Sequence, residues 1–136
     1  MAVTLVNPPE LARARGFSHA AVGRGAFVAL AGQIGWDKTS SLVSTDFVVQ
    51  FEQALANLCV ALAAAGGAPS DIMSLRIYVV DKREYATRLT DVGIAYRKHL
   101  GKHYPAMALV EVSDLLEPGA RVEIEGLAVI ADEVAK

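Results

Sequence analysis

Two long amphipathic segments constrain the fold of this chain more than any other feature of its sequence. Residues 46–65 carry apolar side chains at steps of three and four, which is the spacing of one helix face. Residues 82–100 repeat that spacing. The apolar positions of the two segments are Phe47, Phe51, Leu55, Leu58, Leu62 and Ala65, and Tyr85, Leu89, Val92, Tyr96 and Leu100. We therefore predict two helices that each bury one stripe of residues. Thr45 would cap the first helix, which Gly66 and Gly67 would end, and Gly101 would close the second.

The remaining segments have the composition of β-strands. Strands are predicted at residues 3–6, 17–22, 26–31, 72–80, 106–112 and 121–130, where β-branched and aromatic residues gather between turn residues. Gly23-Arg24-Gly25 predicts a hairpin turn between the second and third strands. The predicted strands and helices together indicate an α+β fold in a single domain over residues 1–136. Two helices cover only one face of a sheet, so we predict a mixed sheet of about six strands with both helices on one face.

The last two predicted strands indicate what the uncovered face carries. Side chains alternate along a strand, so Met107 and Leu109 share one face of residues 106–112, and Glu123, Glu125 and Leu127 share one face of residues 121–130. We expect both sets on the face that the helices leave open. A soluble monomer rarely exposes so large an apolar surface, so we expect a homo-oligomer formed through this face.

The composition narrows the possible functions. The net charge is −2 with no basic stripe, which disfavours nucleic acid as a partner. Cys59 is the single cysteine, interpreted as a packing thiol, and the three histidines lack metal-ligand spacing, so neither a metal nor a cofactor is expected. The N-terminus does not resemble a signal peptide and no continuous apolar run reaches about 18 residues. We therefore expect a cytoplasmic protein with no membrane partner.

Two carboxylates on the final strand allow two interpretations. Glu123 and Glu125 project from the same face, and partly buried carboxylates are costly unless paired. Arg76 or Arg121 could pair with them in a network that holds subunits together. Alternatively, one glutamate polarises water as a general base. The pattern alone favours the ion-pair network, and a slip of the strand register would decide which glutamate faces a pocket.

Four motifs in order along the chain resemble the Rid family, also called YjgF or liver perchloric-acid-soluble protein. They are Gly32-Gln33-Ile34, Tyr78-Val79-Val80-Asp81, Tyr104-Pro105-Ala106 and Val122-Glu123-Ile124-Glu125-Gly126. The resemblance covers nearly the whole chain. It implies a chorismate-mutase-like fold and a homotrimer whose sites are clefts between adjacent subunits. The activity it implies is hydrolysis of reactive imines and enamines to a keto acid and ammonia.

The resemblance also implies site residues, with three departures. The arginine that follows Pro-Ala in the family and holds the substrate carboxylate is replaced by Met107, which has no charge and no donor, and no neighbour in the sequence replaces it. Ala31 and Phe17 stand where the family often has serine and tyrosine. Glu123 matches the glutamate that positions the hydrolytic water. The backbones of Leu109 and Gly32 would assist it.

These departures lead to one main hypothesis and two alternatives. The chain would be a divergent Rid-family trimer that hydrolyses a small imine, enamine or related carbonyl compound, without the arginine that binds carboxylates elsewhere in the family. Glu123 would be the catalytic residue, and substrate would contact Phe17, Ala31, Gly32, Met107 and Leu109. The first alternative is a non-catalytic trimer that binds small molecules. The second, an endoribonuclease, has less support because the chain has no basic stripe.

Overall fold

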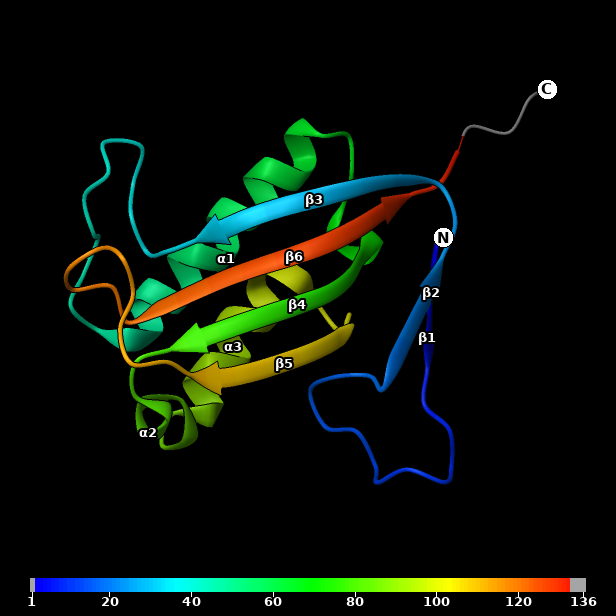
Figure 1. Cartoon of the computed structure of the whole chain (residues 1–136), viewed down its shortest axis with the longest axis horizontal. Coiled ribbons are helices and arrows are strands. Elements are labelled where there is room, and N and C mark those ends of the chain that lie inside the picture. The colour runs from blue at the N-terminus through cyan, green and yellow to red at the C-terminus, as the bar shows by residue number, and fades with distance from the viewer. Residues whose placement is uncertain (1, 133–136) are drawn as a thin grey trace.

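The computed structural model describes residues 2–132 and contains six strands and two main helices, as predicted. The elements in chain order are β1 (Val3–Val6), β2 (Ala20–Gly23), β3 (Ala26–Gln33), α1 (Phe47–Ala64), the 3₁₀ turn η1 (Pro69–Asp71), β4 (Ile72–Val79), α2 (Lys82–Ala86), α3 (Leu89–Leu100), β5 (Ala106–Glu111) and β6 (Val122–Ile130). Helices α1 and α3 lie together behind the sheet in Figure 1, which leaves its other face open.

The sheet is mixed and divided into two parts. Four strands run in the order β3-β6-β4-β5, in which only β4 and β5 are parallel, and β1 pairs with β2 in a separate antiparallel ribbon. We call residues 3–23, which include this ribbon, the N-terminal arm; it extends from one end of the main sheet in Figure 1. A parallel bridge between Ser18 and Ala106 joins the arm to β5.

The predicted hairpin at Gly23-Arg24-Gly25 is wrong. β3 pairs with β6 from Ala26 onward, opposite Ile130, and β2 pairs with β1. The physical reason lies at Gly25, whose φ is 142°. A Cβ on Gly25 would lie 2.0 Å from the carbonyl oxygen of Ile130, so the backbones of the two segments are in direct contact there. β3 is therefore paired with the final strand as soon as it begins.

Helix α1 follows its predicted pattern closely, although its cap differs. Asp46 is the N-cap rather than Thr45, because its carboxylate accepts a hydrogen bond from the backbone N–H of Val49 at 3.1 Å. By length and composition α1 could cross a membrane, with a mean hydropathy of 1.5, contrary to the expectation that no segment would qualify. The mean hydropathy of an 18-residue helix can be high even where polar residues interrupt each continuous apolar run. The buried face of α1 packs on the sheet, so α1 is a core helix.

The second predicted helix is broken into α2 and α3. The chain leaves helical geometry at Arg88, whose φ is −126°. From this position the Arg88 guanidinium pairs with Asp46 at 2.8 Å and with Asp91 at 3.3 Å. The apolar spacing continues across the break, which is why residues 82–100 read as one helix. The predicted end at Gly101 is confirmed by its φ of 60°.

The face predicted for Met107 and Leu109 is also wrong. They pair in parallel register with Leu75 and Ile77 of β4 and pack against the core beneath the helices. Residues paired in this way share a face, so β5 presents Ala108 and Val110 to the open side instead. Alternation predicted which residues share a face but not which face the helices cover.

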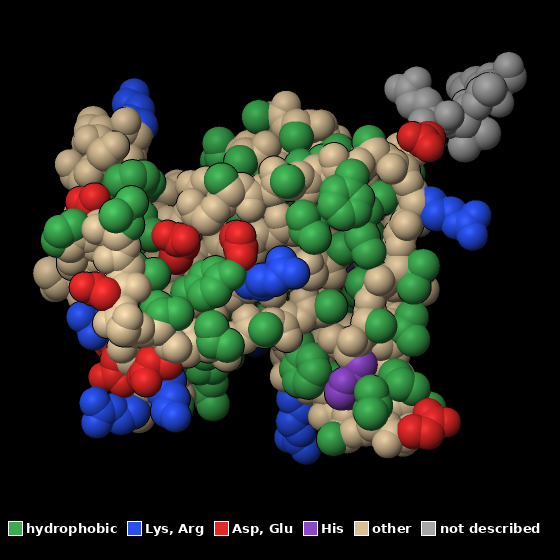
Figure 2. All heavy atoms as spheres, in the orientation of Figure 1, with side chains coloured by type: hydrophobic (Ala, Val, Ile, Leu, Met, Phe, Trp, Pro, Cys, Tyr) green, Lys and Arg blue, Asp and Glu red, His purple; other side chains and the backbone are tan. Residues whose placement is uncertain are grey.

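The open face carries the carboxylates, as predicted. Glu123 and Glu125 of β6 lie opposite Tyr78 and Arg76 of β4, while the residues between them on β6 are buried under the helices. Phe27 is 69% exposed and Val110 47% exposed on the outer strands. Figure 2 shows hydrophobic side chains spread over this face, with acidic and basic groups among them.

Candidate functional site

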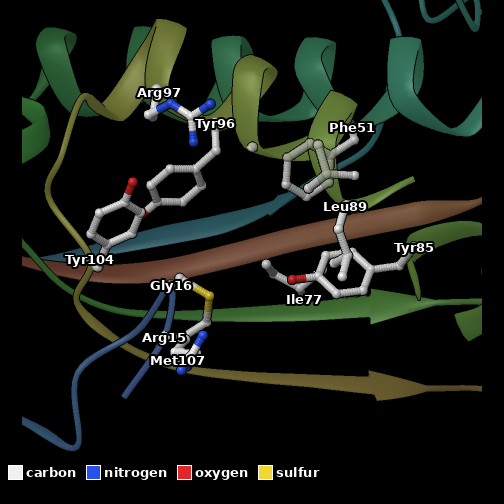
Figure 3. Close-up of a pocket in the computed structure, with 12 residues that line it drawn as sticks. Arg15, Gly16, Phe51, Ile77, Tyr85, Leu89, Tyr96, Arg97, Tyr104 and Met107 are labelled. Carbon is white, nitrogen blue, oxygen red and sulfur yellow. The ribbon is translucent and has the colours of Figure 1, made fainter. Parts of the chain in front are cut away.

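A cavity of about 370 Å³ lies between the helices and the edge of the sheet next to Met107 (Figure 3). Most of its lining is apolar or aromatic and comes from all three helices, β4 and β5, with the N-terminal arm closing one side. The lining residues are Arg15, Gly16, Phe51, Ile77, Tyr85, Leu89, Val92, Gly93, Tyr96, Arg97, Tyr104 and Met107. We call it the Met107 cavity.

Tyrosine rings form much of this surface. Tyr96 and Tyr104 stack with centroids 5.3 Å apart and planes 9° from parallel, and the Tyr96 hydroxyl donates to the His103 carbonyl at 2.6 Å. Burial raises the pKa of Tyr96 and of Tyr85, so both phenols stay protonated near neutral pH. The cavity therefore offers flat, uncharged ring faces to a ligand.

A smaller pocket of about 240 Å³ adjoins the cavity at Met107 and brings three predicted residues together. Phe17, Met107 and Leu109 line it, with Arg15, Gly16 and Tyr85. The arm is held here by Ser18, which is 5% exposed. The Ser18 hydroxyl donates to the Tyr104 carbonyl at 2.6 Å, and the Ser18 N–H donates to the Pro105 carbonyl at 3.0 Å.

Arg15 brings a cation beside Met107, where no neighbour in the sequence supplies one. Its side chain lies beside Met107 in Figure 3, and both residues line both pockets. Arg97 lies at the opposite side of the cavity, next to Tyr96. Within residues 2–132 neither arginine forms an ion pair with a carboxylate. Sequence reasoning missed Arg15 because it belongs to an irregular segment far from Met107 along the chain.

The other predicted site residues gather on β3 and β6. The β3–β6 register shifts between Leu30 and Gln33, so Ala31 and Gly32 lie in a bulge. A Cβ on Gly32 would lie 2.6 Å from Oε2 of Glu123, so this carboxylate rests directly against the glycine backbone. No larger residue fits there without moving the carboxylate.

The two glutamates of β6 differ in their contacts. The Tyr78 hydroxyl donates a hydrogen bond to Glu125, whereas the Glu123 carboxylate accepts no hydrogen bond within residues 2–132. Arg121, one of the predicted partners, instead pairs with Glu84, with Nε 2.6 Å from Oε1. That part of the ion-pair interpretation is therefore wrong. Glu123 is the carboxylate of this face that remains available to a water or a ligand.

The six predicted site residues thus fall into two groups. Phe17, Met107 and Leu109 lie at the cavity side of the sheet, and Glu123 with the Ala31–Gly32 bulge lies at the β3–β6 side. Met107 and Glu123 occupy opposite faces of the sheet. One copy of the chain does not bring these two side chains to a common ligand.

Residues 2–132 contain no group of three or more His, Cys, Asp or Glu side chains arranged to hold a metal ion. His103 bonds the carbonyl of Ile72 at 2.8 Å, and His99 lies 3.3 Å from Glu52. Burial raises the pKa of the half-buried Cys59 thiol, which agrees with a packing role.

Comparison with known proteins gives one family. Residues 8–130 match the family model described as endoribonuclease L-PSP. A RutC family protein of Pyrococcus horikoshii is 35% identical over 109 residues, which cover 79% of this chain and 82% of that protein. The 2-iminobutanoate/2-iminopropanoate deaminase of Salmonella typhimurium is 32% identical over 111 residues, covering 79% and 83%.

Solved structures agree with this family. A Yersinia pestis protein of unknown function in the conserved Rid family superposes with a TM-score of 0.86 at 30% identity, covering 96% of this chain and all of that one. A YjgF-family protein of Mycobacterium tuberculosis gives a TM-score of 0.63 at 33% identity, covering 95% and 100%. The four-motif resemblance and the fold are therefore confirmed.

Proposed function

The chain belongs to the endoribonuclease L-PSP family, also called the Rid or YjgF family, and from this premise we propose that it hydrolyses small imines or enamines at clefts between the copies of a homotrimer. Water adds to the carbon of the C=N bond and the C–N bond breaks, so that a carbonyl compound and ammonia leave. No cofactor is needed for this reaction. The proposed setting is the cytoplasm, as for an enzyme acting on metabolic intermediates.

The separation of Met107 and Glu123 onto opposite faces is the observation that carries the proposal. A site that uses both groups needs the Glu123 face of one copy to meet the Met107 side of another. The open face supplies the apolar surface for this contact, since it exposes Phe27 and Val110. Contact between copies would also exclude water around the Glu123 carboxylate, which would strengthen its interaction with a reacting water.

The residues have distinct roles in this scheme. Glu123 takes a proton from the attacking water and returns it to the leaving nitrogen. The Gly32 backbone fixes the position of the Glu123 carboxylate, and the Leu109 carbonyl orients the water. Phe17, Ala31 and Met107 contact the substrate. Met107 itself can give no charged contact to a substrate carboxylate, so 2-iminobutanoate would be a poor substrate.

An imine-hydrolysis assay tests the reaction directly. 2-Iminobutanoate and imines with larger bodies would be generated freshly in the assay, and keto-product formation followed with and without protein. We expect the larger imines to be hydrolysed and 2-iminobutanoate to be hydrolysed slowly. Turnover of 2-iminobutanoate at the rate of the deaminase relatives would contradict the role given to Met107, and absence of turnover on every imine would contradict hydrolysis.

Size-exclusion chromatography with light scattering tests the assembly. The expected mass is that of three chains at micromolar concentration. A monomer at that concentration would remove the basis for a site shared between copies.

A trimer that binds small molecules without catalysis is the second candidate. The Met107 cavity favours it because an apolar pocket of this size can bind a ligand with no reacting group nearby. It predicts that Glu123→Gln leaves every measurable function unchanged. RNA cleavage, which the family description names, has less support, since the net charge is −2 and the sequence has no run of basic residues.

A further inference from the structure

The Met107 cavity combines an aromatic lining with two arginines, a pairing that the proposed reaction does not require. Arg15 and Arg97 lie on opposite sides of the cavity, with the Tyr96–Tyr104 stack on one side between them (Figure 3). Neither forms an ion pair with any carboxylate among residues 2–132. Arginines at a cavity without acidic partners are suited to an anionic ligand.

Arg15 is held at the cavity by the fold of the arm. Gly16 has a φ of 73°, a conformation that favours glycine, and it turns the chain between Arg15 and Phe17. Immediately after this turn, the hydroxyl and the N–H of Ser18 bond to the carbonyls of Tyr104 and Pro105. The backbone at Arg15 is thus held next to the start of β5 at Ala106, one residue before Met107.

Arg97 is placed by α3. Its guanidinium lies over Gly93, one turn earlier, where a Cβ would stand 3.0 Å from Nη1. The absence of a side chain at Gly93 therefore lets the guanidinium lie along the helix at the cavity. Arg15 and Arg97 both line the cavity, so one bound ligand can interact electrostatically with both arginines.

We propose that the Met107 cavity recognises an organic carboxylate with a large, planar apolar body, and that Arg15 holds the carboxylate. The forked guanidinium matches both carboxylate oxygens, while the body lies against the faces of Tyr85, Tyr96 and Tyr104. Arg97 adds a second, weaker attraction. The volume of about 370 Å³ is in the range of pockets that enclose drug-sized ligands, about 300–1,000 Å³, rather than one fitted to a four-carbon acid.

This inference rests on the proposed function for its chemistry, and it names the substrate class: imines of 2-keto acids with an aromatic side chain. The cation missing at residue 107 is supplied from another segment of the chain. The carboxylate would approach from the arm side of the cavity instead of from the residue that follows Pro105 and Ala106.

Calorimetric titration with three probes tests the recognition. The probes are 3-phenylpropanoate, its neutral amide 3-phenylpropanamide, and propanoate, which keeps the charge and lacks the ring. The acid with the ring should bind at least about tenfold more tightly than either of the others, because it alone uses both the arginine and the tyrosines. Equal affinities for the acid and the amide would overturn the proposal.

Substitutions distinguish a specific contact with Arg15 from a general effect of positive charge on binding. Arg15→Ala should weaken 3-phenylpropanoate binding about ten- to hundredfold and leave the amide nearly unchanged. The affinity of Arg15→Lys for 3-phenylpropanoate should lie between those of the unsubstituted chain and Arg15→Ala, because lysine keeps the charge and loses the forked guanidinium. Arg97→Ala should weaken binding less than Arg15→Ala. Arg24→Ala is the matched control, since Arg24 is exposed and lines neither pocket. An equal loss in Arg15→Ala and Arg24→Ala would also overturn the proposal.

A parallel pair of measurements keeps this inference distinct from the proposed function. The titrations are repeated on Glu123→Gln, and hydrolysis of phenylpyruvate imine is measured on the unsubstituted chain and on Arg15→Ala. Arg15-dependent binding without any imine hydrolysis would support the cavity assignment and contradict the proposed reaction. Hydrolysis that is equally fast in Arg15→Ala would support the reaction and contradict the cavity assignment.

Discussion

The cavity side of the sheet and its open side position their side chains by different means. At the Met107 cavity, helices, strands and the N-terminal arm all contribute residues, and the shape depends on how these elements pack. On the open side, two neighbouring strands suffice, because a bulge at Ala31–Gly32 places backbone directly against Glu123. Packing of several elements thus shapes the cavity that would bind the ligand, and contact with the backbone positions the glutamate that would catalyse its hydrolysis.

The largest effect should come from removing the carboxylate of the open side. Glu123→Gln keeps the size of the side chain and removes its ability to accept a proton, so imine hydrolysis should fall about 10²- to 10⁴-fold. Binding of 3-phenylpropanoate should stay within about twofold, since the cavity is untouched. Steady-state assays and calorimetry measure the two quantities.

Glu125→Gln provides the matched control for that change. Glu125 lies on the same strand and face but is engaged by the Tyr78 hydroxyl. Its substitution should slow hydrolysis far less than Glu123→Gln. A larger loss in Glu125→Gln than in Glu123→Gln would show that Glu125, and not Glu123, is the catalytic glutamate of β6.

Mixing two defective chains tests whether the regions cooperate across copies. Glu123→Gln and Arg15→Ala chains would be co-expressed with different tags, and the mixed assemblies purified through both. Some sites in a mixed assembly would combine an intact cavity with an intact Glu123, so activity should rise at least about tenfold above that of Glu123→Gln alone. Activity no higher than the average of the two uniform assemblies would indicate that each copy works by itself.

A methyl group at residue 32 should disturb only the open side. In Gly32→Ala the new Cβ would stand 2.6 Å from Oε2 of Glu123, so the carboxylate must shift. A displacement of about 1 Å can lower turnover by up to about a hundredfold, and we expect about tenfold here because the side chain can rotate. Ligand binding in the cavity should be unchanged.

The control for this change lies in the same bulge. Ala31→Gly adds no atom, so it should slow hydrolysis less than Gly32→Ala. If the two variants were equally slow, the loss would reflect general loosening of β3 rather than displacement of Glu123.

The smallest expected effect concerns the support of the cavity. Asp46 caps α1 and also binds Arg88 at the break between α2 and α3, from which Tyr85 and Leu89 enter the cavity. Asp46→Ala should lower the free energy of unfolding by about 1 kcal/mol, measured by urea denaturation. Asp46→Asn, which keeps the capping oxygen, should cost less.

The same carboxylate gives a signed pH dependence. The hydrogen bond from Arg88 holds the pKa of Asp46 below its usual value of 3.8. Because the pKa of Asp46 is lower in the folded chain than in the unfolded chain, its carboxylate stabilises the fold at pH values above the unfolded-state pKa. That contribution is lost as the pH falls through the folded-state pKa. The stability difference between the unsubstituted chain and Asp46→Asn should therefore shrink in acid. A difference that stays constant down to pH 2 would contradict the Asp46–Arg88 link.

The sequence predicted regular elements well where local spacing determines them. The apolar steps between Phe47 and Leu62 identified α1, and β-branched composition identified β4. It failed where distant residues decide the outcome. Arg88, at the break between α2 and α3, pairs with the distant Asp46. The face of Met107 follows from the parallel pairing of Ser74 with Ala106, which alternation within β5 does not specify.

The same distinction applies to the candidate site. Gly32 and Glu123 belong to short motifs on neighbouring strands, and the structure brings them into contact. Arg15 belongs to no motif, and its place beside Met107 depends on bonds from Ser18 to a segment at the other end of the chain. Residues of this second kind are visible only after folding.

The contact between Gly32 and Glu123 has an evolutionary consequence. A Cβ at residue 32 and a carboxylate at residue 123 compete for one volume, so the two positions should covary among relatives. Lineages that keep the glutamate should keep the glycine, and those with a smaller side chain at 123 should be free to acquire a larger one at 32. The identity of one backbone position then becomes a marker, readable in any aligned sequence, for whether the opposite strand still carries its acid.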